Sequence, residues 1–195
     1  MNRKWLAGGV AAFLAIVAVL ALVLGGVVGR SIVPSSSPDT PPSTVRFSDT
    51  LTDVSISYPA TWVRRFPKDQ GVRLVASSPD ASAAVSVSVR KSGLEPVTAD
   101  TLAIVRPLTD DLLHQDDRIR DVPEPAAVTI GDLPGYRYRY TYRTDGRGSG
   151  AHVHYFLFNG DRLVQIVLQA VPAAKLPQLQ ATFDTIAGTF RASPR

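Results

Sequence analysis

The chain has 195 residues, 21 basic and 17 acidic side chains, a formal net charge of +4 and no cysteine. The lack of cysteine excludes a disulfide framework, a thiolate nucleophile, a cysteine-ligated metal and a lipidated N-terminal cysteine. Three basic residues, Arg3, Lys4 and Arg30, flank one uncharged stretch, which leaves 18 basic and 17 acidic side chains in the rest of the chain. We expect no nucleic-acid partner, because the basic excess does not lie on a folded face.

The uncharged stretch, residues 5–29, predicts a transmembrane signal anchor. At about 1.5 Å per residue a helix of this length reaches ~37 Å, more than the ~30 Å hydrocarbon core of a bilayer. A cleaved signal peptide is the alternative, but its apolar region would be shorter and Val28 to Ser31 is a poor cleavage site. The positive charges before the span predict a cytoplasmic tail, residues 1–4, and a single-pass plasma-membrane protein with its folded domain outside the cytoplasm.

Two further features of the N-terminal region bear on how the protein is held. Gly25 and Gly29 form a Gly-x-x-x-Gly pair, which allows a weak homodimer through the membrane helix. Residues 30–46 are rich in proline and serine, a composition that favours extended, solvated backbone. We therefore predict a linker over 30–46, followed by one folded domain over 47–195.

The first half of that domain shows mainly strand periodicity. Residues 54–58, 72–76 and 83–90 alternate apolar and polar side chains with period two, as half-buried strands do. Apolar residues then recur at helical spacing over 102–112, which predicts a helix. Pro107 is expected to kink or break this helix.

The second half predicts four strands and a closing helix. Residues 126–130 and 136–143 are expected strands, and Asn159-Gly160 predicts a tight hairpin between strands 152–158 and 162–170. Apolar side chains from Leu176 onward predict an amphipathic helix starting near Pro177. The expected fold class is α+β, with an antiparallel β-sheet of about six to seven strands covered by helices.

Three segments carry a resemblance to a known fold. Residues 56–62 (Ile-Ser-Tyr-Pro-Ala-Thr-Trp), residues 131–137 (Gly-Asp-Leu-Pro-Gly-Tyr-Arg) and the closing helix ending in Thr189-Phe190 resemble the PsbP-like fold family. This family has bacterial envelope members, and the LpqN-type lipoproteins are similar in plan. The resemblance implies a non-catalytic module that binds partners or supports an assembly. This chain would be a membrane-anchored variant, because the lipidated cysteine of the lipoprotein members is missing.

The hairpin at Asn159-Gly160 suggests which side chains share a face of the sheet. If Phe158 faces Asp161, His154 faces Gln165 and His152 faces Val167, which leaves the opposite face apolar. We expect the tyrosines at 136, 138, 140 and 142 to join the apolar face. The other face would then be a cationic partner-binding face composed of Arg137, Arg139, Arg143, His152, His154 and Gln165. Arginines that merely keep a sheet face soluble are the alternative.

No pattern in the sequence predicts a catalytic, metal or cofactor site. His152 and His154 could offer two ligands to a metal, but a third ligand cannot be assigned. The loop 146–150 has the glycines of a phosphate-binding loop without its lysine or following helix, and Asp116-Asp117 is expected to be a solvated pair. The predicted function is a non-catalytic, membrane-anchored extracytoplasmic module that docks an unidentified envelope protein or stabilises an envelope assembly. The alternatives are a carrier of a lipid or other hydrophobic ligand, and a small metal-dependent enzyme.

Overall fold

The computed structural model describes residues 43–119, 122–144 and 148–193. The strands of the first half are β1 (Thr44–Asp49), β2 (Val54–Pro59), β3 (Val63–Arg65), β4 (Val72–Ser77) and β5 (Ala83–Lys91). The next elements are α2 (Leu102–His114), β6 (Ala126–Ile130), β7 (Leu133–Arg143), β8 (Ser149–Asn159) and β9 (Arg162–Ala170). The chain closes with the 3-10 helix η3 (Ala173–Lys175), helix α3 (Leu176–Gly188) and strand β10 (Arg191–Ala192).

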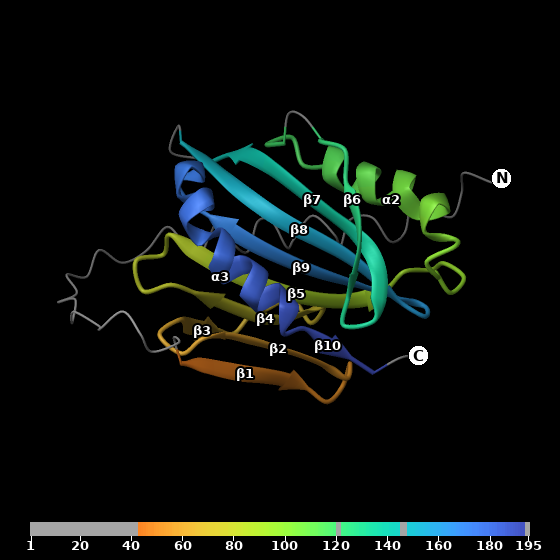
Figure 1. Cartoon of the computed structure of the whole chain (residues 1–195), viewed down its shortest axis with the longest axis horizontal. Helices are drawn as coiled ribbons and strands as arrows, with labels where there is room; N and C mark the ends of the chain where they lie inside the picture. The colour runs from red at the N-terminus through yellow and green to blue at the C-terminus, as the bar shows by residue number, and fades with distance from the viewer. Residues whose placement is uncertain (1–42, 120–121, 145–147, 194–195) are drawn as a thin grey trace.

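The strands form two antiparallel sheets. Seven strands make the large sheet in the order β3-β4-β5-β9-β8-β7-β6, and β1, β2 and β10 make a small sheet in the order β1-β2-β10. Figure 1 shows the small sheet below the large one, next to the C-terminal end of α3. The predicted antiparallel sheet of six to seven strands is confirmed in size, but the predicted strand 54–58 belongs to the small sheet, which was not predicted.

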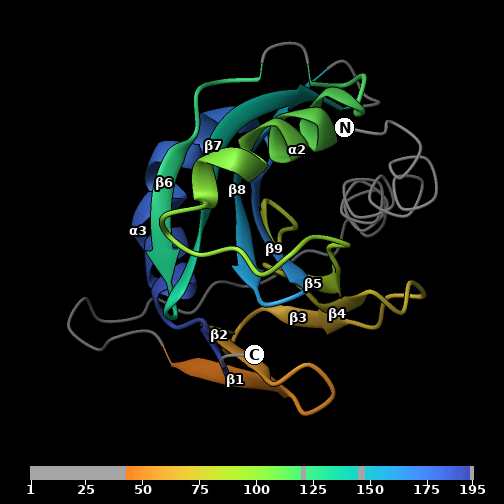
Figure 2. The same cartoon turned by 90° about the vertical axis from the view of Figure 1, so that its right-hand side faces the viewer.

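The two helices cover opposite faces of the large sheet, as Figure 2 shows for the part formed by β7 to β9. On one side, Phe183 and Ile186 of α3 pack in a core that also contains Ile56 of the small sheet and Trp62. On the other side, the buried face of α2 packs against tyrosines of β7 and phenylalanines of β8. Apolar burial on both faces holds the layers together.

Three strands at the edges of the sheets were not predicted from the sequence. Strand β1 begins at Thr44, inside the predicted linker 30–46, and only Phe47 of its six residues is buried. All three residues of β3 are exposed, and β10 has only two residues. Strands that bury so little show no period-two pattern, since that pattern arises from burial of one face.

Pro107 was expected to kink or break its helix, and it does not break it. Helix α2 runs unbroken from Leu102 to His114 with Pro107 inside it. Leu102, Val105 and Leu113, which lie on both sides of the proline, are buried against the sheet. This packing outweighs the single backbone hydrogen bond that proline removes.

The predicted hairpin at Asn159-Gly160 is confirmed, with a register two residues away from the expected one. Asn159 pairs with Arg162, so His154 lies opposite Val167 and His152 opposite Gln169. A shift of two residues leaves every side chain on its predicted face, because the side-chain period of a strand is two.

Among the described residues, no helix is both long and apolar enough to cross a membrane. The predicted tail 1–4, the predicted span 5–29 and linker residues 30–42 lie outside those residues.

Candidate functional site

The structure divides the predicted partner-binding face between two sides of the sheet. Tyr138 pairs with His154 and Tyr140 with His152, whereas Arg139 pairs with Val153. Directly paired residues share a face, so the tyrosines lie with the histidines and the arginines lie with the apolar side chains. The expectation that the tyrosines join the apolar face is therefore wrong, and so is the single cationic face of arginines, histidines and Gln165.

The register between β7 and β8 explains this correction. Tyr142 pairs with Gly150, and a β-carbon at Gly150 would lie only 2.3 Å from the ring of Tyr142. The ring therefore occupies space that only a glycine leaves free. A register one residue away would have placed the tyrosines on the other face.

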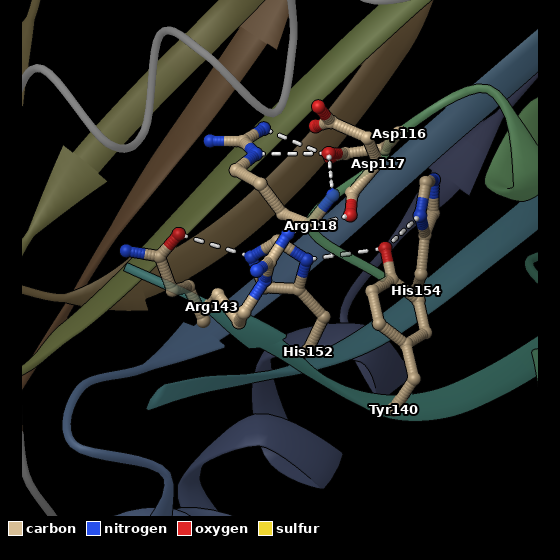
Figure 3. Close-up of polar contacts among 8 residues, drawn as sticks. Asp116, Asp117, Arg118, Tyr140, Arg143, His152 and His154 are labelled. Carbon is tan, nitrogen blue, oxygen red and sulfur yellow. Dashed lines mark hydrogen bonds and ion pairs between the residues drawn. The ribbon is translucent and has the colours of Figure 1, made fainter. Parts of the chain in front are cut away.

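A buried hydrogen-bond network joins the two histidines, and Figure 3 shows its centre at Tyr140. The Tyr140 hydroxyl lies 3.1 Å from Nδ1 of His152 and 3.1 Å from Nδ1 of His154. On their far sides, His152 Nε2 lies 3.0 Å from Gln169 Oε1, and His154 Nε2 lies 3.1 Å from Gln165 Oε1. All five side chains are buried, so each histidine is held between a tyrosine and an amide.

The single proton of the Tyr140 hydroxyl limits which atoms of this network can donate and which can accept hydrogen bonds. If both histidines donate Nε2–H to a glutamine oxygen, both Nδ1 atoms need a donor, and Tyr140 has one proton to give. A half-turn of the Gln165 amide resolves the conflict. Its nitrogen then donates to His154 Nε2, His154 Nδ1–H donates to Tyr140, and Tyr140 donates to His152 Nδ1.

Burial keeps both histidines uncharged at neutral pH. Removal from water lowers the pKa of His152 to about 4, and the same effect, helped by the neighbouring His152, lowers the pKa of His154 to about 3. Burial also raises the pKa of the Tyr140 hydroxyl well above its ordinary value. The network is therefore a set of neutral donors and acceptors.

An ion pair closes one end of this region. Asp116, expected to be solvated, is buried, and its carboxylate accepts two hydrogen bonds of 2.8 Å from the Arg118 guanidinium (Figure 3). Burial opposes the charge, but the hydrogen bonds from Arg118 hold the pKa of Asp116 below its usual range. Arg143 donates to the backbone oxygen of Asp117 at 3.2 Å, so this member of the predicted face ties two segments together.

Two arrangements typical of catalytic sites do not form among the described side chains of the network. Ser86 and Ser88 lie on the same face, but their hydroxyls hydrogen-bond no histidine among the described residues, so no nucleophile–base pair is formed. Within that part of the chain, no three histidine or acidic side chains converge as metal ligands. The histidine nitrogens are instead used by tyrosine and glutamine.

One arginine on the opposite face, Arg139, borders a hollow. Arg139 is exposed and, with Thr141, lines an open depression of about 340 Å³. Its remaining lining residues are Pro123, Tyr140, Ala151 and Leu176. Arg137 is half-buried and lies within hydrogen-bonding reach of Tyr155. Arg139 is therefore the predicted site residue that presents its charge beside a concave surface.

Four members of the network and its surroundings were not predicted from the sequence: Gln169, Tyr140, Asp116 and Arg118. Gln169 is detectable, since it lies four residues after Gln165 in one strand and so shares its face. The face on which the Tyr140 side chain lies depends on the β7–β8 register, which the sequence does not determine. Asp116 and Arg118 lie outside regular structure, where no periodicity reports burial.

No protein-family profile matches the sequence, and no curated protein is similar enough to count as a match. Among solved structures, cyanobacterial PsbP from Synechocystis sp. PCC 6803 is similar, with 18% identity, a TM-score of 0.59, and coverage of 82% of this chain and 98% of that chain. A Bacteroides thetaiotaomicron protein matches with 14% identity, a TM-score of 0.51, and coverage of 77% of this chain and 48% of that chain.

The similarity to cyanobacterial PsbP spans almost that whole chain, and it rests on the arrangement of the strands and helices, because identity is low. The segments at residues 56–62 and 131–137 predicted this arrangement. The described domain has a PsbP-like fold.

Proposed function

We propose that this chain is a membrane-anchored extracytoplasmic binding module that docks a protein partner in the cell envelope and is not an enzyme. The uncharged stretch 5–29, with its positive flank, supports the anchor and the orientation. The near balance of charge in the rest of the chain supports a protein partner over a nucleic acid.

The observation that carries the proposal is the hollow beside Arg139. A guanidinium offers a planar set of donors that fits a carboxylate with two parallel hydrogen bonds. Leu176, Pro123 and Ala151 give the same hollow an apolar lining, which can bury part of a side chain. The surface therefore suits an acidic side chain on a partner protein.

The distribution of large side chains favours docking over lipid transport. Phe183 and Phe190 fill one side of the sheet, and Tyr138, Phe156 and Phe158 fill the other. The described groove between β2 and α3 has a volume of about 220 Å³. Pockets for small molecules usually have volumes of about 300–1,000 Å³, so this groove is too small for a lipid. The hollow at Arg139 is larger, at about 340 Å³, but it is an open depression beside a charged side chain and not an enclosed apolar cavity.

The metal-dependent enzyme is the weaker alternative, because the two histidines already have protein partners at all four ring nitrogens. Elemental analysis of the purified full chain and of the His152→Gln/His154→Gln variant tests it. Our proposal predicts the same negligible zinc content in both proteins. Stoichiometric zinc in the wild type that disappears from the variant would support the enzyme.

Docking is tested by photo-cross-linking in intact cells. A photoreactive amino acid replaces the exposed Thr141, and the cross-linked products of the full chain are compared with and without Arg139→Glu. We expect one discrete protein adduct that falls at least about tenfold on charge reversal, since a repelled carboxylate loses a charge-assisted bond. Lys91→Glu, an equal charge change at an exposed site on β5, should leave the adduct unchanged. An adduct that survives Arg139→Glu would contradict the proposal.

A further inference from the structure

A second surface combines an exposed aromatic ring with positive charge. Phe66, just after β3, is 84% exposed, which is unusual for so large an apolar side chain. Arg64, Arg65 and Lys68 around it are exposed as well. We call residues 64–68, the last two residues of β3 and the three that follow, the basic–aromatic loop.

Contacts hold the ring of this loop at the surface. The Arg64 guanidinium stacks on Phe66, 5.2 Å from the ring centroid, and on Phe47 of β1, 4.8 Å from that centroid. Arg64 thereby links the loop to the small sheet through cation–π contacts. The nearby carboxylate of Asp69 is engaged by Arg90 and accepts a 2.7 Å hydrogen bond from the backbone of Gly71. The loop therefore keeps its positive character.

The loop lies close to the point where the chain leaves the domain toward its N-terminus. The backbone N–H of Ala60 donates to the Ser43 oxygen at 2.8 Å. Phe66 comes six residues after Ala60, so it lies no more than about 22 Å from that point. Residues 30–42, which precede it, could reach about 40 Å if extended. A domain tied to a bilayer by this segment can bring the loop onto the membrane surface.

We propose that the basic–aromatic loop docks on the anionic lipid surface next to the anchor. Arginine and lysine near a bilayer are attracted to lipid phosphates, and an aromatic ring partitions into the headgroup region. The loop sets how the domain stands on the membrane and so which of its faces points away from it. This inference rests on the anchor of the proposed function but not on the hollow at Arg139.

The chain's lack of cysteine allows a specific test. The full chain with Gln70→Cys carries one environment-sensitive fluorophore beside the loop and keeps Phe66 intact. It is reconstituted into vesicles of phosphatidylcholine, with or without phosphatidylglycerol, and exposed to aqueous iodide as a quencher. The matched control is Ile104→Cys, which labels another exposed position, 76% exposed, on α2.

We expect the label at position 70 to be protected from iodide and blue-shifted only in the anionic vesicles, whereas the label at 104 responds alike in both. Arg65→Ala with Lys68→Ala should weaken surface association by roughly 30-fold. Phe66→Ser should abolish the blue shift, and raised salt should reverse the protection.

The outcomes separate the loop from the anchor. Flotation of the chain with both vesicle types shows that the anchor holds. If it floats but position 70 is quenched equally in both types, the loop proposal is overturned and the anchor stands. Equal protection in neutral vesicles also overturns it, and a chain that floats with neither type overturns both. Protection that appears only when a partner protein is added would assign the loop to a protein interface instead.

Discussion

Among the described residues, the hydroxyl of Tyr140 is the group that hydrogen-bonds both His152 and His154. Tyr140→Phe leaves the ring in place but removes a buried partner from two imidazoles, and such a loss costs about 1–3 kcal/mol. Tyr142→Phe is the matched control, because its buried hydroxyl has no partner among the described residues. Urea unfolding at pH 7.5 should show the loss of stability for Tyr140→Phe and little or none for Tyr142→Phe. Equal effects would contradict the network.

The two histidines should make the fold sensitive to mild acid. Their folded pKa values of about 4 and about 3 lie below the ordinary 6.5, so between pH 6.5 and 4 the unfolded chain binds more protons. Stability is then complete above about pH 7 and falls as the pH drops through this window, by about 2 kcal/mol per histidine at pH 5. Urea midpoints at pH 7.5 and 5 measure the loss.

His152→Gln and His154→Gln should each reduce this pH dependence. The exposed His114, whose Nδ1 lies 2.8 Å from the Asp110 backbone oxygen, provides the control His114→Gln, which should leave the dependence nearly unchanged. A pH profile that persists in the double variant would show that other groups cause it.

The predicted site residues show how far the sequence reaches at the scale of single residues. His152, His154 and Gln165 do share a face, since the hairpin turn and period two determined it. Arg137 and Arg139 were assigned to the wrong side because the β7–β8 connection gave no turn signal that fixes the register. Gly150 is the residue that favours the observed register, because it leaves space for the ring of Tyr142 opposite it.

Helix α2 provides a test at the scale of one element. Pro107 is exposed within the helix, so Pro107→Ala restores a backbone donor toward Ala103 without disturbing the core. We expect a gain in stability of about 1 kcal/mol or more. Pro177→Ala, in the first turn of α3 where proline is well tolerated, should change stability by less than about 0.5 kcal/mol. Thermal unfolding of both variants checks this, and a loss of stability for Pro107→Ala would contradict it.

Elements were predictable where they bury a regular stripe. The central strands β5 and β9, the hairpin β8–β9 and helix α3 all appear where the pattern indicated. The edge strands β1 and β3 were not predictable, because their side chains are mostly exposed and do not alternate between apolar and polar. The effect of Pro107 on the helix was overestimated. Proline disfavours a helix interior by a few kcal/mol, but tertiary packing of the residues before and after it outweighs this local preference.

At the scale of the whole molecule, the fold was predictable from the sequence, but the shape of the candidate docking surface was not. The order of elements and short signatures such as Tyr58-Pro59 and Trp62 were sufficient for a PsbP-like domain, which the similarity to cyanobacterial PsbP supports. The hollow at Arg139 is lined by residues from β7, β8, α3 and the segment before β6. No sequence pattern indicates that these segments lie next to one another. A docking surface depends on register and layer packing at once.

Our central proposal, a docking module outside the cytoplasm, can be tested by one labelling measurement. Single cysteines replace Thr141 in the hollow and Ile104 on α2, and a membrane-impermeant maleimide is applied to intact cells and to the purified full chain. We predict that position 104 reacts in intact cells, that position 141 reacts more slowly there, and that both react equally fast after purification. Equal rates in intact cells would contradict docking at the hollow, and labelling only after the cells are lysed would contradict the extracytoplasmic location.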